Sequence, residues 1–153
     1  MKRLLTHRLT LLFVAGAALL GGHGSVYGVT RGAGGAAQAA RVGREFRLRA
    51  GRALTLAREN LRLRLVRVAA DSRCPTGVDC VWAGNAEVLI EVGTKNRRVS
   101  KTLRLNTNAS PERPAEDKYR GYTVRLVELK PYPRASRKIR PGEYTATLLI
   151  SKE

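Results

Sequence analysis

Apolar and polar side chains alternate along most of the chain after residue 40, and this period of two constrains the fold more than any other feature. Successive side chains of a β-strand point to opposite faces, so an alternating segment has one apolar and one polar face. No segment after residue 40 has a convincing helical period. The expected strands are residues 46–49, 53–56, 61–70, 86–92, 99–105, 122–129 and 144–150.

About seven or eight short strands separated by turn residues predict an all-β protein, an antiparallel β-sandwich of the immunoglobulin-like kind. A small open barrel is the alternative architecture. Within residues 61–70 the apolar positions change parity where Val66 directly follows Leu65. This change predicts a β-bulge or a strand that crosses between sheets. Residues 106–121 and 130–142 are polar, contain prolines and are expected to form long loops.

The first 39 residues have the composition of an export signal. Three basic residues within the first eight positions precede an apolar run at residues 9–20. This run has the length of a signal-peptide core and is short for a membrane span. A Gly/Ala-rich stretch follows it and ends in Ala37-Gln38-Ala39, which fits the small-x-small cleavage rule.

We therefore expect residues 1–39 to be a signal peptide and processing region and residues 40–153 to be the β-sandwich domain. The protein is expected to be exported to the periplasm or the extracellular space. Cleavage after Ala17 and an uncleaved N-terminal anchor are the alternatives.

Both histidines, His7 and His23, lie within the segment expected to be removed. The remaining chain would then have no Ser-His-Asp or Cys-His catalytic device and no histidine metal site. Neither of the two common nucleotide-binding glycine motifs follows an expected strand. We therefore predict that the protein is not an enzyme and uses no metal or cofactor.

The chain is strongly basic, with 29 Lys and Arg residues against 12 Asp and Glu residues and a formal charge of +17. Four of the basic residues and none of the acidic ones precede residue 40, so 25 basic and 12 acidic residues remain after it. Such a charge suits an anionic partner or surface. An arginine-rich proteome would produce the same composition without any partner.

Residues 71–84, which we call the cysteine loop, hold both cysteines and the only tryptophan, Trp82. A bond between Cys74 and Cys80 would close a short ring and stabilise the fold by roughly 2 kcal/mol. The spacing of five residues does not suit a thioredoxin-like pair, and a zinc site needs more ligands. We predict a structural disulfide, with free thiols or metal binding as the alternatives. Trp82 is expected to be a core residue that covers the disulfide, rather than an exposed stacking surface.

The cysteine loop resembles a pattern in small exported bacterial proteins and lipoproteins of unassigned function. Their D-S-R-C-P…C-x-W-x-G motif follows a β-strand. The resemblance covers about the last two-thirds of the chain. It implies a small β-rich exported domain and carries no catalytic residues with it. This chain departs from the lipoproteins because it has no cysteine near its N-terminus for a lipid anchor. The matching residues are Asp71, Ser72, Arg73, Cys74, Pro75, Cys80, Trp82 and Gly84.

Two groups of basic residues are candidates for anion binding, because Arg binds phosphate, sulfate and carboxylate groups through two donors. The first is Arg47, Arg49, Arg62 and Arg64, which would share one sheet face if their strands were neighbours. The second is Arg134, Arg137, Lys138 and Arg140, within residues 130–142, which we call the basic loop. The alternative for the first group is a solvated outer sheet face that binds no ligand. The alternative for the second group is a disordered basic loop that binds no ligand.

Two carboxylate pairs, Asp71 with Asp79 and Glu87 with Glu91, have the residue types of a glycosidase site. The two glutamates are more simply explained as partners of arginines on the neighbouring strand. The sequence thus favours a non-enzymatic exported binding or interaction module, whose partner is anionic envelope material or an envelope protein. The alternative is a basic nucleic-acid-binding protein, although the chain lacks interleaved aromatic residues for base stacking.

Overall fold

The computed structural model describes residues 40–96 and 100–153, and these residues form eight strands and one 3-10 turn. The predicted signal peptide and its cleavage sites lie outside the described residues. The elements are β1 Glu45–Arg49, β2 Ala53–Leu56, β3 Leu61–Asp71, β4 Ala86–Thr94, β5 Ser100–Asn106, β6 Glu116–Tyr119, β7 Tyr122–Lys130, η1 Pro141–Glu143 and β8 Thr145–Lys152.

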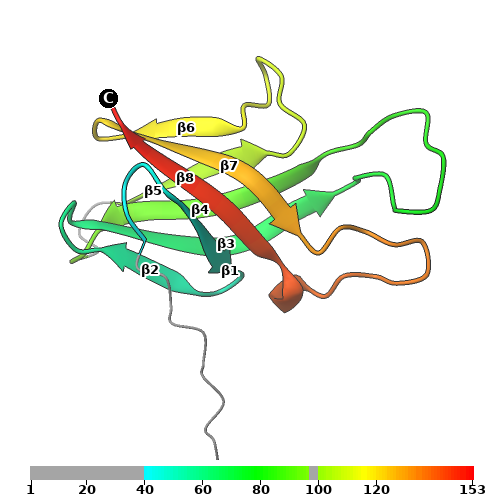
Figure 1. Cartoon of the computed structure of the whole chain (residues 1–153), viewed down its shortest axis with the longest axis horizontal. Coiled ribbons are helices and arrows are strands. Elements are labelled where there is room, and N and C mark those ends of the chain that lie inside the picture. The colour runs from blue at the N-terminus through cyan, green and yellow to red at the C-terminus, as the bar shows by residue number, and fades with distance from the viewer. Residues whose placement is uncertain (1–39, 97–99) are drawn as a thin grey trace, which may run out of the picture. The chain divides into compact units, whose positions relative to one another are not determined.

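The strands form two antiparallel four-stranded sheets, with the orders β1-β8-β7-β6 and β2-β3-β4-β5. Figure 1 shows one sheet lying across the other, with the strands of the two layers running obliquely to each other. The predicted all-β sandwich is therefore confirmed. Its likeness to an immunoglobulin domain is one of architecture. Within each sheet the strands are neighbours in sequence order, except that β1 pairs with β8, whereas immunoglobulin domains use Greek-key connections.

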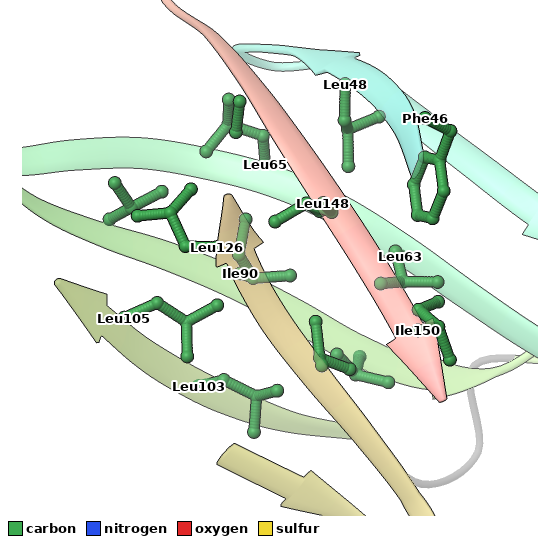
Figure 2. Packing of buried hydrophobic residues seen from close by; sticks show 14 of the residues in the cluster. Phe46, Leu48, Leu63, Leu65, Ile90, Leu103, Leu105, Leu126, Leu148 and Ile150 are labelled. Carbon is green, nitrogen blue, oxygen red and sulfur yellow. The ribbon is translucent and has the colours of Figure 1, made fainter. Parts of the chain in front are cut away.

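The core lies between the two sheets and is built from the apolar positions of the alternating segments. Figure 2 shows leucine and isoleucine side chains from both sheets pointing toward one another, with Phe46 of β1 beside them. Leu63, Ile90 and Leu148 are among the fully buried members. The alternation thus creates an apolar inner face on each sheet, and packing the two faces removes both from water.

The predicted change of parity in β3 is confirmed as a register shift between Leu65 and Arg67 in the pairing with β4. A second shift follows between Val68 and Ala70, and a third occurs in β7 between Leu126 and Glu128. The shift in β7 brings Leu129 into the core although it is three residues from Leu126. These irregularities lie toward the ends of β3 and β7 that carry the cysteine loop and the basic loop.

The expectation of a single long loop at residues 106–121 was wrong, because β6 lies within it. β6 pairs with β7 through a two-residue turn at Arg120 and Gly121, whose φ angles are 49° and 75°. Turns with two positive φ angles match the twist of a hairpin, but they usually contain Asn-Gly or Asp-Gly. The remaining expected strands are present, and among the described residues no helix is long and apolar enough to span a membrane.

Candidate functional site

The cysteine loop and the basic loop project from the same end of the sandwich, although they leave different sheets (Figure 1). They meet where Thr76 and Arg134 form a parallel bridge. The backbone N–H of Thr76 donates to the carbonyl oxygen of Pro133 at 2.9 Å, and its hydroxyl donates to the same oxygen at 3.3 Å. We call this end of the domain, made of the two loops, the cap.

Cys74 and Cys80 form a disulfide with their Cα atoms 5.9 Å apart, as predicted. The ring that the bond closes lies within the cysteine loop and contains Pro75 and Gly77. Gly77 has a φ of 82°, a conformation that glycine adopts without steric cost. A disulfide favours an oxidising compartment.

The buried centre of the cap is an ion pair between Arg73 and Asp71. The guanidinium Nε and Nη2 of Arg73 donate to the two carboxylate oxygens of Asp71 at 2.8 and 2.7 Å. Its Nη1 donates to the carbonyl oxygen of Leu129 at 2.6 Å, and Nη2 also donates to that of Pro131 at 3.0 Å. Arg73 is only 6% exposed. One side chain from the cysteine loop thus ties the end of β3 to the end of β7 in the opposite sheet.

The hydroxyl of Tyr144 completes this network by donating to Asp71 Oδ2 at 3.0 Å. Burial raises the pKa of Tyr144 to about 12, and the hydrogen bond to Asp71 contributes to the rise. Burial also acts to raise the pKa of Asp71, but the hydrogen bonds and charge of Arg73 outweigh it and hold that pKa below its ordinary value. Near neutral pH the cap is therefore fastened by an ionised Asp71 and an uncharged Tyr144.

The neck of the cysteine loop is closed by Ser72, Gly84 and Asn85. The N–H of Ser72 donates to the carbonyl oxygen of Asn85 at 2.8 Å, and the Ser72 hydroxyl bonds both backbone polar groups of Asn85. Gly84 has a φ of 69°, and a Cβ atom there would lie 1.8 Å from the Ser72 carbonyl oxygen. The close approach of the two chains across the neck therefore requires glycine at this position.

Two asparagines that the sequence analysis did not single out attach the β5–β6 connection to the neck. Asn85 donates through Nδ2 to Oδ1 of Asn106 at 2.8 Å, and its own Oδ1 accepts the N–H of Asn108 at 3.0 Å. Asn106 is 2% exposed and donates through Nδ2 to the carbonyl oxygen of Pro114. The only available sequence signal was the polar residue directly after the motif glycine.

The expectation that Trp82 is a core residue was wrong, because Trp82 is 82% exposed and its neighbour Val81 is 90% exposed. The large side chain of the cysteine loop that is buried is Arg73, whose guanidinium carbon lies 5.0 Å from the centre of the Tyr132 ring. Hydrogen bonds to two carbonyls and a carboxylate satisfy its buried charge.

Two cavities flank Tyr132 on the cap. One, of about 320 Å³, lies between the end of the cysteine loop and the end of β7 and is lined by Ala83, Gly84 and Leu129 among others. The other, of about 290 Å³, is lined by Thr76, Arg134 and further residues of the basic loop. Both are open depressions of mixed polarity on the cap.

The four sheet arginines do not form one surface, because β1 and β3 belong to different sheets. Arg47 and Arg49 therefore lie on one outer face of the sandwich, and Arg62 and Arg64 lie on the other. Arg49 donates to the carbonyl oxygen of Gly142 at 3.1 Å, at the base of the cap.

The two glutamates of β4 pair with arginines of neighbouring strands, as predicted. Glu91 lies opposite Arg64 at 3.9 Å, and Glu87 binds Arg104. Exposed pairs of this kind stabilise a fold by at most about 1 kcal/mol. Their carboxylates form these ion pairs on the outer face of the sheet, and neither glutamate lines the two cavities of the cap.

The four basic side chains of the basic loop are exposed. Arg137 binds Glu143 of η1, and the N–H of Arg140 donates to the same glutamate. The backbone of Arg134 is held by the bridge to Thr76. The loop is thus anchored at several points while its charged groups face solvent.

The acid dependence of stability should reveal the state of Asp71. A carboxyl whose pKa is lowered by folding adds stability above its unfolded pKa, and this stability is lost as the pH falls through the folded pKa. We expect the difference in unfolding free energy between the wild type and Asp71→Asn to be largest near neutral pH. It should shrink as the pH falls below the ordinary aspartate value of 3.8. Urea denaturation followed by circular dichroism from neutral pH to about pH 2 measures this difference. A difference that stays constant over this range would contradict an ionised Asp71.

Within residues 40–96 and 100–153 no group of three or more histidine, cysteine, aspartate or glutamate side chains is arranged to hold a metal ion. No protein-family model matches the chain, and the searches of curated proteins and of solved structures give no significant match.

Proposed function

We propose that this protein is an exported, non-enzymatic binding module that uses its cap to hold anionic material of the cell envelope. The observation that carries the proposal is the arrangement of the basic loop. Four exposed cationic side chains lie on a loop that is bridged to the cysteine loop and contains no acidic residue between positions 130 and 142. Such a cluster attracts anions, with the charge of Arg137 partly offset by its ion pair with Glu143.

The rigidity of the cap supports a binding role. The disulfide, the neck and the buried Arg73–Asp71 pair fix the cysteine loop, and the bridge at Thr76 fixes the basic loop against it. A surface that is ordered before it meets its partner loses less conformational freedom on binding. Many polar groups of the cap form hydrogen bonds that hold its surface in place. This arrangement fits a binding role better than a catalytic one.

Export rests on the composition of residues 1–39, and the disulfide agrees with it. The resemblance of the cysteine loop to small exported bacterial proteins points the same way. A nucleic-acid-binding role would draw on the same positive charge, but an exported protein meets little nucleic acid. The absence of histidine after residue 23 further disfavours an enzyme that relies on a histidine base.

Salt dependence and loop substitutions test the proposal. We expect the exported, processed protein to bind immobilised heparin, a polysulfated probe, and to lose this binding steeply as salt rises, because charges are screened beyond about 10 Å at 0.1 M salt. Changing Arg134, Arg137, Lys138 and Arg140 together to serine should weaken binding at least about tenfold. The melting temperature should change little, because exposed loop charges contribute little to folding.

The matched control removes the same number of charges from the outer sheet faces, by changing Arg47, Arg62, Arg64 and Arg67 to serine. It should weaken binding much less than the loop variant, because these residues lie on strands β1 and β3 and not on the basic loop. Equal losses in the two variants would show that only net charge matters. Absence of salt-sensitive binding would refute the proposal, and a preference for single-stranded DNA over heparin would favour the nucleic-acid alternative.

A further inference from the structure

The cysteine loop presents two adjacent apolar side chains to solvent at a position where the fold cannot bury them. Val81 and Trp82 are 90% and 82% exposed, more than any other large hydrophobic residue of the described chain. Single exposed apolar residues are common on soluble proteins, but an adjacent valine and tryptophan on a fixed loop form a small protruding apolar surface. We call these two residues the apolar tip.

The tip is held in place from both sides. The disulfide fixes Cys80 immediately before it, and the N–H of Cys74 donates to the carbonyl oxygen of Ala83 at 3.0 Å immediately after it. Gly84 then enters the neck, where its contact with Ser72 leaves no room for a side chain. Hydrophobic residues that are fixed in an exposed position cannot fold back onto the domain, so their exposure is a built feature of the loop.

Basic residues lie at the same end of the domain as the apolar tip. The basic loop is bridged to the cysteine loop at Thr76, and Tyr132 of that loop shares a cavity with Ala83, the residue after Trp82. Asp79 is the only acidic residue between positions 72 and 84, and residues 130–142 contain none. The apolar tip and the cationic groups therefore belong to one end of the domain.

We propose that the cap docks on an anionic lipid bilayer, with Val81 and Trp82 inserted at the interface and the basic loop bound to the headgroups. This inference rests on the proposed function and names its partner. Tryptophan favours the boundary between hydrocarbon and water, where its ring is partly buried and its N–H stays hydrated. Stable attachment to a membrane takes two signals, and a small apolar insertion together with a polybasic patch provides both.

The size of the tip favours a bilayer over a protein partner. A specific protein–protein interface buries about 800 Å² on each partner and depends on a well-packed apolar centre. Two exposed side chains at the tip of a loop do not form such a centre. A bilayer requires no matching pocket, and the neighbouring lysine and arginines each strengthen attachment to an anionic surface about fivefold.

The single tryptophan makes the test direct, because all tryptophan fluorescence comes from Trp82 whatever the state of residues 1–39. The protein is mixed with vesicles of phosphatidylglycerol and phosphatidylcholine, and separately with vesicles of phosphatidylcholine alone. With the anionic vesicles we expect the emission of Trp82 to shift to shorter wavelength and to become protected from acrylamide. With the neutral vesicles we expect little binding at the same lipid concentration, because the charge contribution is missing.

Substitutions at the tip separate insertion from simple adsorption. Val81→Ser retains the fluorophore and should weaken binding to the anionic vesicles about tenfold. Trp82→Ala, measured by co-sedimentation, should weaken it at least as much. Val66→Ser is the matched control, since Val66 is half-buried in β3 and lies outside the tip and outside the cavity beside Ala83. It should leave vesicle binding unchanged, and neither tip variant should alter the melting temperature.

Three outcomes would overturn the inference while the proposed function stands. In the first, vesicles bind through the basic loop but the emission of Trp82 does not move and Val81→Ser has no effect, which means adsorption without insertion. In the second, heparin binds and vesicles do not. In the third, the tip variants weaken heparin binding as strongly as vesicle binding. Absence of binding to both heparin and anionic vesicles would overturn the inference and the proposed function together.

Discussion

Replacing Arg73 by methionine is expected to lower the free energy of unfolding by about 3–5 kcal/mol. The substitution leaves the carboxylate of Asp71 buried without its partner, and it leaves the carbonyl oxygens of Leu129 and Pro131 without their donor. An isolated buried charge is costly, because nothing in the protein replaces its hydration. Urea denaturation followed by circular dichroism measures the loss, since Trp82 is already exposed in the folded state and its fluorescence reports unfolding poorly.

Arg134→Met is the matched control for this experiment, because Arg134 belongs to the same end of the domain but its side chain is exposed. It should change the unfolding free energy by less than about 0.5 kcal/mol. The double variant Asp71→Asn/Arg73→Met should recover part of the loss, because it removes both buried charges. If Arg73→Met and Arg134→Met unfold at the same urea concentration, the ion pair does not hold the cap to the sandwich.

Replacing Gly84 by alanine is expected to destabilise the fold by about 3 kcal/mol or more. The added Cβ would lie 1.8 Å from the carbonyl oxygen of Ser72 and 2.9 Å from the Cα of Arg73. Both atoms belong to the backbone, so no side chain can rotate away and the neck itself must open. The neck also positions Arg73, and the same substitution should therefore weaken the ion pair. Thermal and urea denaturation measure the effect.

Gly77→Ala provides the comparison, because Gly77 also has a positive φ, 82°, but no atom lies within 4 Å of its added Cβ. It carries only the conformational cost of a left-handed alanine, about 1 kcal/mol. The difference between the two variants isolates the close contact at the neck. Equal destabilisation would mean that backbone conformation alone, rather than the approach to Ser72, explains the glycine at position 84.

Most strands could be predicted because alternation is a local property. β6 could not, since its sequence EDKY has one buried residue, Tyr119, and its turn contains Arg120 where asparagine is usual. The pairing of the strands could not be predicted from the local sequence either. β1 pairs with β8, which follows it by about one hundred positions, and nothing local at either strand indicates the other. This pairing decided that the sheet arginines lie on opposite faces.

The cysteine loop could be singled out from the sequence, but Trp82 was expected in the core and the burial of Arg73 was not anticipated. Tryptophan is usually buried and arginine usually exposed, so the sequence favoured Trp82 as the cover of the disulfide. The burial of Arg73 depends on the carbonyls of Leu129 and Pro131, which are more than fifty positions away. Only Asp71, two residues before it, was a local sign that the arginine would have a partner.

The position of β8 has a consequence for the order in which the protein can fold. β8 is the last strand along the chain but an inner strand of its sheet, between β1 and β7. The sheet of β2 to β5 can form by successive hairpins as the chain is made, whereas β1 has no partner until β8 exists. Contacts so distant in sequence form late and slowly. In a chain that is synthesised or exported from its N-terminus, β1 therefore has no strand to pair with until residues Thr145–Lys152 are present. The first strand of the chain thus joins its sheet only after the last strand is available.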